Sequence, residues 1–281
     1  MKLKYTECPR DSWQGLTKQI PTEEKIRYIQ SLIDAGFKDI DMGSFVSPKA
    51  VPQLADTEEV LSRLSPQRDS RLLAIIANLR GLERALQAKN LTVVAYPLSV
   101  NERFQKQNTN KSITQSWDLL KEMQEMLKGE KLELLVHLSM GFGNPYGDSW
   151  KAIDTARAHS KLREIGVERI SLADTVGKAD IRVLESVLKE VEEVQNVGLH
   201  MHAKANAWQP LITKALEYDI SHFEGAMAGI GGCPFAEDEL LGNLPSEKLL
   251  AFLAKKFELD IALNELPSIA DKAASIAVRY S

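Results

Sequence analysis

The sequence has little cysteine, no long apolar segment and no excess of positive charge. Cys8 and Cys233 are the only cysteines in 281 residues, so a disulfide framework is excluded and a reducing compartment is expected. No run reaches the roughly 18 apolar residues of a membrane span, and the first residues lack the apolar core of a signal peptide. The net charge of −4 argues against nucleic acid or an acidic membrane as a partner. We therefore expect a cytoplasmic protein that binds small molecules or copies of itself.

Two further features are missing. No Gly-x-Gly-x-x-Gly motif follows the first strand-like run, which argues against a dinucleotide-binding fold. No segment rich in Pro, Gly or Ser divides the chain, so we expect one domain over residues 1–281. An open, doubly wound sheet is the alternative to a barrel, because the length of the chain does not decide between them.

Apolar runs with the length of buried strands alternate with stretches of helical apolar spacing. The eight strand-like runs are Leu3 to Cys8, Asp39 to Phe45, Leu72 to Asn78, Leu91 to Leu98, Leu132 to Met140, Arg169 to Thr175, Val197 to Lys204 and His222 to Gly229. The helical stretches between them are Thr22 to Ala35, Val51 to Leu64, Leu79 to Lys89, Ile113 to Lys128, Ser149 to Ile165, Ile181 to Val194 and Asn206 to Tyr218. This alternation predicts an α/β fold of the (β/α)8, or TIM, barrel type.

Two more helical segments follow the eighth strand-like run, Glu237 to Lys255 and Ala262 to Tyr280. The second exceeds what a minimal barrel needs. We expect residues 262–281 to form a C-terminal helical extension that covers one end of the barrel or an oligomer interface. A homodimer or a larger homo-oligomer is therefore expected.

Polar residues gather where the predicted strands end. In (β/α)8 barrels the chemistry lies at the carboxyl ends of the strands, where the loops converge. The polar residues found there, in chain order, are Arg10, Asp11, Asp41, Ser44, Asn78, Ser139, Asp174, His200, His202 and Asn243, the last of which is expected to begin a helix.

The motif His200-Met201-His202 indicates a metal site. Side chains alternate along a strand, so both imidazoles face the same side. A buried carboxylate such as Asp11 is very costly without a compensating charge, and a divalent cation would supply one. We therefore predict that Asp11, His200, His202 and Asn243 are metal ligands. Nitrogen and oxygen donors suit Mg²⁺, Mn²⁺, Zn²⁺ or Co²⁺, of which the first two are preferred.

Several motifs together resemble the 3-hydroxy-3-methylglutaryl-CoA lyase family. In order they are Pro9 to Gln14, Gly43 to Gln53, Asn78 to Gly81, Ile170 to Gly177, His200-x-His202, Gly229 to Ala236 and Gly242 to Leu244. The Arg-Asp and His-x-His elements are shared with a wider group of metal-dependent lyases and Claisen condensing enzymes. The resemblance implies an acyl-CoA substrate, cleaved between carbons to acetyl-CoA and a keto acid such as acetoacetate, with a divalent metal as cofactor.

The resemblance implies the same four metal ligands and adds catalytic roles. Arg10 would hold the thioester oxygen, and Cys233 would be an acid on a mobile loop. Asp41, where the family has glutamate, and Asp174 would complete the polar shell, and His200 or an aspartate would accept the hydroxyl proton. Five further residues are candidates for substrate contacts: Gln14, Ser44, Asn78, Ser139 and Lys204.

The chain also departs from the family. After the second metal histidine the family has Asp-Thr-Tyr-Gly-Gln, but this chain has Ala203 and Lys204, which removes an acid and adds a cation. Trp13 stands in a segment where the family has Gly-Leu. Trp13 and Lys204 could each change substrate selection by ~1 to 3 kcal/mol. The alternatives are a related acyl-CoA lyase, a Claisen-type condensing enzyme with another acyl group, and an inactive barrel that binds a CoA ester.

The remaining residues of interest are expected to be structural. Cys8 lies inside the first strand-like run and is expected in the core. His137, His159 and His222 have no partner at a suitable spacing, so we interpret them as structural or surface residues. The polar stretch from Asn101 to Asn108 is either a solvated loop or a contact with the CoA moiety.

Overall fold

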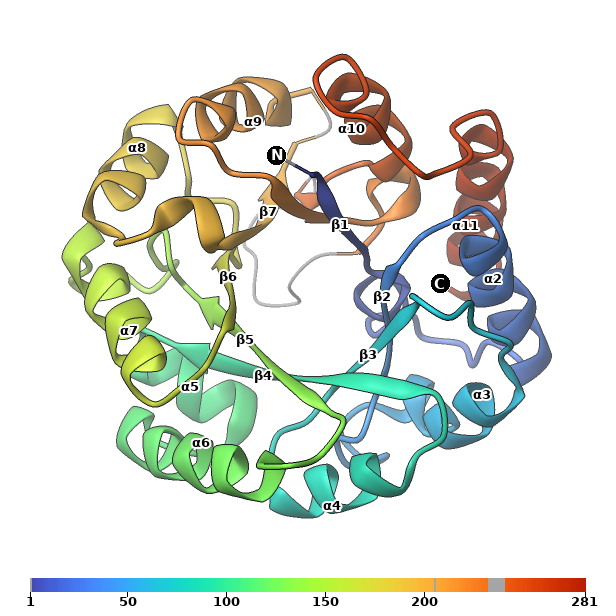
Figure 1. Cartoon of the computed structure of the whole chain (residues 1–281), viewed down its shortest axis with the longest axis horizontal. Coiled ribbons are helices and arrows are strands. Elements are labelled where there is room, and N and C mark those ends of the chain that lie inside the picture. The colour runs from blue at the N-terminus through green and yellow to red at the C-terminus, as the bar shows by residue number, and fades with distance from the viewer. Residues whose placement is uncertain (1, 205, 232–240) are drawn as a thin grey trace.

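The computed structural model is a closed barrel of parallel strands surrounded by helices, and it describes residues 2–204, 206–231 and 241–281 (Figure 1). The barrel strands are β1 (Lys4–Glu7), β2 (Asp39–Ser44), β3 (Arg71–Ile75), β4 (Leu91–Ser99), β5 (Glu133–Ser139), β6 (Arg169–Asp174), β7 (Gly198–Ala203) and β8 (His222–Gly225). Each pairs in parallel with the next, and β1 pairs with β8. The predicted (β/α)8 barrel is confirmed.

The interior of the barrel is apolar on one side and polar on the other. Leu73, Val93, Ala95 and Leu135, from β3, β4 and β5, form a separate apolar cluster. Because strand residues alternate in direction, residues two apart along a strand share a face. His137 therefore shares the inner face of Leu135. The polar part of the interior is where the candidate site lies.

Most helices lie where the apolar spacing predicts, but the helix expected from Val51 begins at Thr57, and the described part of the segment expected from Glu237 is helical only from Ser246. These helices are α2 (Thr22–Asp34), α3 (Thr57–Arg63), α4 (Leu79–Gln87), α6 (Ile113–Leu127), α7 (Ala152–Glu164), α8 (Ile181–Glu190), α9 (Trp208–Leu216), α10 (Ser246–Leu253) and α11 (Leu266–Tyr280). Elements not expected from the sequence are α1 (Pro9–Trp13), α5 (Glu102–Thr109), β9 (Gly242–Asn243) and the 3₁₀ turns η1 (Pro52–Leu54), η2 (Val194–Asn196) and η3 (Met227–Gly229).

Of the two alternatives for the stretch after β4, the structure excludes a loop. The stretch forms the helix α5, which Asn101 caps by accepting a hydrogen bond from the Phe104 amide at 2.9 Å. One prediction about local structure was wrong. Asn243 does not begin a helix. It lies in β9, which pairs antiparallel with β7 and places Asn243 opposite His202, and α10 begins only at Ser246. The pairing with a strand 40 residues away overrides the local helical spacing.

The C-terminal extension lies on the outside of the barrel rather than over one of its ends. Helix α11 packs beside α2 (Figure 1), with Leu266, Ile269 and Ile276 buried. The Tyr280 hydroxyl donates to Glu24 at 2.6 Å. Val278 on the same helix is 79% exposed, so part of α11 faces solvent in this chain. The expected oligomer stays a prediction.

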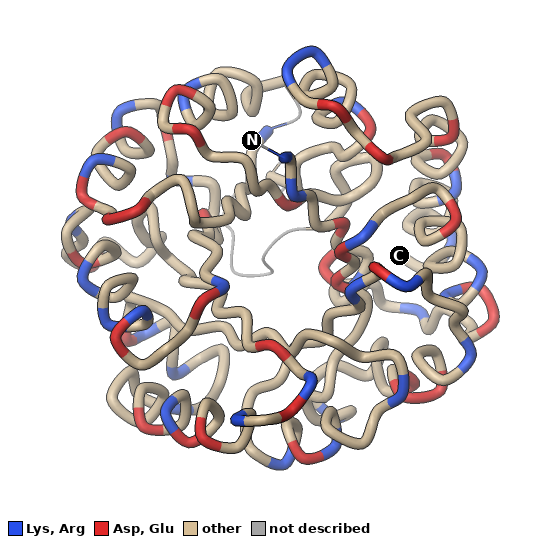
Figure 2. Tube along the Cα trace, in the orientation of Figure 1, with Lys and Arg blue, Asp and Glu red and all other residues tan. Residues whose placement is uncertain are grey.

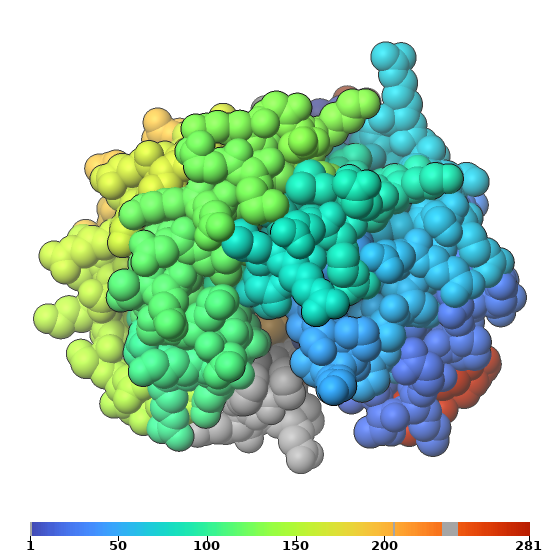
Figure 3. Space-filling view, turned by 90° about the horizontal axis from the view of Figure 1, so that it is seen from below, coloured from blue at the N-terminus to red at the C-terminus, as the bar shows by residue number. Residues whose placement is uncertain are grey.

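The surface carries charges of both signs. Figure 2 shows them interspersed around the outer helices, in keeping with the net charge of −4. The side view of Figure 3 shows residues of α4 and α6, coloured cyan to green, next to one another on the outside of the barrel. No helix in the described part of the chain is long and apolar enough to cross a membrane.

Candidate active site

The four predicted metal ligands converge at the carboxyl end of the barrel. Strand β1 leads into α1, which brings Asp11 to the mouth, and His200 and His202 point inward from β7. The ligand atoms of these three buried residues all lie within 4.8 Å of one another. Asn243 joins them by donating from Nδ2 to Asp11 Oδ2 at 2.7 Å. Four residues from three elements, α1, β7 and β9, therefore form one buried cluster.

Two polar atoms of this cluster have no hydrogen-bond partner among the described residues: His202 Nε2 and Asn243 Oδ1, both buried. His202 Nδ1 lies 2.9 Å from the Thr175 carbonyl. A carbonyl only accepts, so Nδ1 carries the proton and Nε2 presents its lone pair, 3.6 Å from Asp11 Oδ2. Buried polar atoms are rarely left unpaired. A divalent cation fits this nitrogen and oxygen donor set.

Arg10 connects this cluster to a second acid, Asp41. Its Nε and Nη2 donate to Asp41 Oδ2, the former at 3.0 Å, and its Nη1 donates to Asp11 Oδ1 at 2.9 Å and to Gln14 at 3.2 Å. Burial alone would lower the pKa of Arg10, but the carboxylates of Asp41 and Asp11 raise it above its ordinary value. These bonds use four of five guanidinium N–H groups, which leaves one for a substrate oxygen.

The two acids beside Arg10, Asp11 and Asp41, differ in their surroundings. Burial alone would raise the pKa of Asp11, but Arg10 and the two histidines lower it below its ordinary value, so it stays ionised. Asp41 is buried, and its Oδ1 has no hydrogen-bond partner among the described residues. This oxygen can accept a hydrogen bond from a ligand.

Gln14 and Asp174 hold other site residues in place. Gln14 Nε2 donates to Asp11 Oδ1 at 2.7 Å. Asp174 accepts backbone N–H groups of Lys178 at 2.8 Å and Ala179 at 2.9 Å. Burial raises the pKa of Asp174, and these hydrogen bonds oppose the rise. Asp174 thus braces the loop after β6, whose Thr175 carbonyl orients His202.

Four other candidates do not join the cluster. The Ser44 hydroxyl accepts from the Val46 amide at 3.1 Å, and the Asn78 side chain caps α4 by accepting from Gly81 at 2.9 Å. Ser139 is the buried last residue of β5, and Lys204 is exposed directly after β7. Their contacts with a substrate stay predictions.

The loop after β8 is attached to α1 and β9. The Ile230 carbonyl accepts from the Ser12 hydroxyl at 3.1 Å and from Asn243 at 3.0 Å. At Gly231, which has φ +89°, a Cβ atom would come within 2.7 Å of the Asp11 carbonyl, so only glycine allows this close approach. Cys233, the predicted acid, lies outside the described residues.

Trp13 is not part of the mouth. Its side chain is buried in the main hydrophobic core and packs edge-on against Tyr28, with ring centroids 5.6 Å apart. The prediction that Trp13 changes substrate selection assumed that its side chain lies near the substrate, and this is wrong. Trp13 lies on α1 and Tyr28 on α2, so the side chain packs against the outer helix α2.

One acid at this end was missed in the sequence. Glu224 on β8 is fully buried, and its Oε2 lies 3.0 Å from both His200 Nδ1 and His137 Nε2. The prediction that His137 lacks a partner was wrong. Burial alone would raise the pKa of Glu224, but the two imidazoles hold it well below its ordinary value. The sequence does contain a signal for Glu224, because it is an acid inside the apolar run from His222 to Gly229.

The chain is similar to known proteins over nearly its whole length. The family model described as HMGL-like matches residues 5–272. A hydroxymethylglutaryl-CoA lyase of Bacillus subtilis is 32% identical over 260 residues, covering 91% of this chain and 85% of the relative. A 3-hydroxy-3-isohexenylglutaryl-CoA/hydroxymethylglutaryl-CoA lyase of Pseudomonas aeruginosa is 32% identical over 257 residues, covering 90% and 85%.

Solved structures agree with these relatives. The crystal structure of the Bacillus subtilis HMG-CoA lyase has a TM-score of 0.92 at 29% identity and covers 99% of this chain and 94% of that one. An HMG-CoA lyase of Acinetobacter baumannii in complex with coenzyme A and 3-methylmalate has a TM-score of 0.88 at 29% identity, covering 99% and 92%. The resemblance seen in the motifs is confirmed, and the chain belongs to the HMGL-like family.

Proposed function

We propose that the protein is a divalent-metal-dependent carbon–carbon lyase that cleaves 3-hydroxy-3-methylglutaryl-CoA to acetyl-CoA and acetoacetate. The observation that carries this proposal is the buried cluster of Asp11, His200 and His202, in which His202 Nε2 and a nearby Asn243 oxygen lack partners among the described residues. The names of the relatives, and the coenzyme A bound to one of them, support an acyl-CoA substrate.

Asp11, His200, His202 and Asn243 would hold the cation through the donor atoms that face one another in the cluster. A cation bound there would lower the pKa of an alcohol placed beside it. We propose Mg²⁺ or Mn²⁺, because the Asp11 carboxylate and the Asn243 side-chain oxygen are the oxygen donors that these cations take. Zn²⁺ and Co²⁺ fit the same donors.

Asp41 is the best-placed acceptor for the proton of the C3 hydroxyl. Its Oδ1 lacks a partner among the described residues, whereas His200 uses Nδ1 for Glu224 and would use Nε2 for the metal. As the C2–C3 bond breaks, C3 becomes the ketone carbonyl and the electron pair passes to C2. The product side is then the enolate of acetyl-CoA. The remaining N–H of Arg10 would donate to the thioester oxygen, where negative charge develops.

The enolate carbon must gain a proton before acetyl-CoA leaves. We propose Cys233 as the donor, with its thiolate regaining the proton that Asp41 accepted. Cys233 follows the loop that is hydrogen-bonded to Ser12 and Asn243. Replacing Cys233 with alanine should lower kcat and leave Mn²⁺ affinity unchanged.

The specificity of the enzyme depends on which acyl group the CoA ester carries. The Pseudomonas aeruginosa relative is named for two substrates, one of which carries an isohexenyl group where the other carries a smaller methyl group. Here Ala203 and the exposed Lys204 follow the metal histidines, and we propose Lys204 as a contact for the substrate carboxylate. Ser44, Asn78 and Ser139 stay candidates at the same end of the barrel. A cytoplasmic location and a homo-oligomer stay predictions.

The direct test uses protein stripped of metal and reloaded with Mg²⁺, Mn²⁺, Co²⁺ or Zn²⁺. We expect release of acetyl-CoA and acetoacetate from 3-hydroxy-3-methylglutaryl-CoA, measured by chromatography. A panel of other 3-hydroxyacyl-CoA esters tests the acyl group. A folded protein that binds metal and cleaves none of these esters would overturn the lyase assignment, whereas preference for another ester would correct only the substrate.

A further inference from the structure

His200 lies between two sets of groups that could hold it. On one side are Asp11 and His202, and on the other are Cys8 and Glu224, and each set has ligand atoms within 4.8 Å of one another and of His200. An imidazole has two nitrogens on different edges of the ring, so each nitrogen can serve one set. Which nitrogen carries the proton therefore decides which set His200 can complete as a metal ligand.

Glu224 determines this choice through hydrogen bonding. Strand register places it directly opposite His200, and its Oε2 lies 3.0 Å from His200 Nδ1. A carboxylate oxygen accepts, so the hydrogen on this bond belongs to Nδ1. Nε2 is then left with its lone pair, facing Asp11 and His202.

His137 in turn holds Glu224. It comes from β5, 87 residues away in the chain, and its Nε2 lies 3.0 Å from the same Oε2 atom that binds His200. Glu224 Oε1 has no hydrogen-bond partner in the described part of the chain. Without His137, the carboxylate would keep only its bond to His200 and could rotate about its side chain. Because two imidazoles bond to the same oxygen, the Glu224 carboxylate has a single favourable orientation.

We propose that Glu224 and His137 form a positioning pair that fixes His200 in its Nδ1–H tautomer and so directs Nε2 to the Asp11 metal site. The inference rests on the metal site of the proposed function and adds two residues that contact neither the metal nor the substrate. Carboxylates behind a metal-bound histidine fix the ring and raise its basicity, and losing one typically costs about 10- to 100-fold in metal affinity.

The first experiment measures Mn²⁺ affinity by calorimetry, with no thioester present. Glu224→Leu removes the acceptor and should weaken binding about 10- to 100-fold. Glu224→Gln keeps an acceptor oxygen and should lose much less. His137→Leu should weaken binding, and His137→Gln, which can still donate to Glu224, should restore it. His159→Gln is the matched control, because His159 is a buried histidine on α7 with no bond to Glu224.

Equal losses in Glu224→Leu and Glu224→Gln would overturn the proposal, because the acceptor would then be irrelevant. Unchanged affinity in Glu224→Leu would also overturn it. Should Glu224→Leu fail to fold, the two His137 variants decide by themselves, since rescue by glutamine is expected only if the hydrogen bond matters.

The second experiment observes the tautomer directly. Long-range ¹H–¹⁵N NMR of metal-free, histidine-labelled protein should show His200 protonated at Nδ1, and Glu224→Leu should abolish that preference. An Nε2–H tautomer in the unaltered protein would contradict the proposal. Because neither experiment involves turnover, a protein that passes both but cleaves no CoA ester refutes the proposed function and leaves this inference intact.

Discussion

The two ends of the barrel differ in whether the carboxylates of their buried acids are fully paired. Strand β2 carries one such acid at each end. Asp39, at the amino end, has both oxygens paired, Oδ2 with Arg71 at 2.5 Å and Oδ1 with Arg169 at 2.8 Å. Asp41, two residues on and facing the same way, gives only Oδ2 to Arg10 and keeps Oδ1 unpaired within the described structure. The carboxylate at the amino end, here called the closed end, is therefore fully paired, although Arg71 Nε lacks a partner among the described residues. The carboxylate at the carboxyl end, here called the open end, keeps one oxygen for a ligand.

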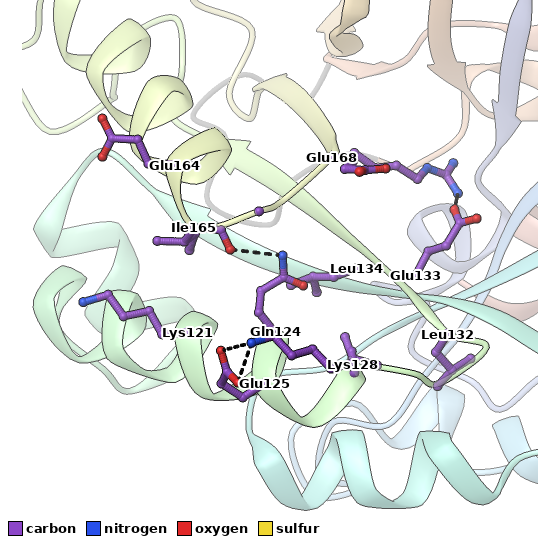
Figure 4. Close-up of a pocket in the computed structure, with 13 residues that line it drawn as sticks. Lys121, Gln124, Glu125, Lys128, Leu132, Glu133, Leu134, Glu164, Ile165 and Glu168 are labelled. Carbon is purple, nitrogen blue, oxygen red and sulfur yellow. Dashed lines mark hydrogen bonds and ion pairs between the residues drawn. The ribbon is translucent and has the colours of Figure 1, made fainter.

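A hollow in the surface does not by itself mark a site in this protein. A hollow of about 720 Å³ lies between α6 and α7, beside the first residues of β5 and β6 (Figure 4). Its charged residues pair with one another, for example Lys128 with Glu125 at 2.7 Å and Arg169 with Glu133 at 3.2 Å. None of the buried unpaired side-chain atoms found in the described residues lines it. Four such atoms from four different residues gather at the candidate site instead: Asp41 Oδ1, His202 Nε2, Glu224 Oε1 and Asn243 Oδ1.

Removing the acid at the open end should have the largest effect. Asp11→Asn loses the charge that binds the cation, and we expect loss of bound metal and a fall in kcat of about 10³-fold or more, since a bound metal contributes several kcal/mol to the transition state. Elemental analysis and the lyase assay measure both. The matched control is Asp39→Asn, which should retain metal. Equal metal content in the two variants would remove the distinction between the ends.

Neutralising the arginine at the open end should have the next largest effect. Arg10→Gln removes the donor proposed for the thioester oxygen, so kcat should fall by about 10²- to 10³-fold. Steady-state kinetics would show this mainly in kcat rather than KM. Arg169→Gln, at the closed end, is the control and should change stability instead. A loss confined to KM would mean that Arg10 binds the ground state only.

At the closed end we expect a loss of stability without a loss of chemistry. Asp39→Ala leaves Arg71 and Arg169 without their shared carboxylate. Breaking a fully buried pair costs about 3 to 5 kcal/mol, and because these arginines are partly exposed we expect about 2 kcal/mol. Denaturant unfolding measures the change. Unchanged stability together with lost turnover would reverse the roles assigned to the two ends.

The smallest effect concerns an acid at the mouth that is already paired. Burial raises the pKa of Glu7 to about 8, although Ser246 and the Met227 amide donate to its carboxylate. An acid with a raised folded pKa binds its proton more tightly when folded, so stability is highest below the ordinary value of 4.5 and falls as pH rises toward 8.

Between pH 7 and 8 this group should lower the free energy of unfolding by about 1 kcal/mol. Glu7→Gln should remove that part of the slope, as measured by urea unfolding at the two pH values. Mn²⁺ affinity should stay as it is, because Glu7 belongs to the paired groups. An identical slope in both proteins would show that Glu7 does not ionise in this range.

Local patterns were enough for most of the fold, but α5 and β9 are two of the elements that they missed. The strand-like runs and the observed strands agree within a few residues, because a buried parallel strand reads as a continuous apolar run. Helix α5 was missed since its sequence is strongly polar, and its caps, Asn101 and Asn110, are the only local signals. β9 was missed because its pairing depends on β7, which is distant in the chain.

The site could be predicted in the same partial way. Asp11, His200 and His202 were found because ligand type and strand spacing are written in short motifs. Glu224 and His137 were not, since Glu224 bonds to His200 across 24 residues of chain and His137 bonds to Glu224 across 87. Asp174 was given a place in the polar shell, but its carboxylate is used by the backbone of its own loop.

The sequence by itself determined the alternation of strands and helices and the chemical types of the metal donors, because both follow from residues close together in the chain. Only the tertiary structure decided which buried acid is satisfied and which is open. Asp39 and Asp41 share a strand and a face, and nothing local distinguishes them. Arg71 and Arg169 reach the first and Arg10 the second from separate strands or strand ends, and that geometry exists only once the barrel has closed.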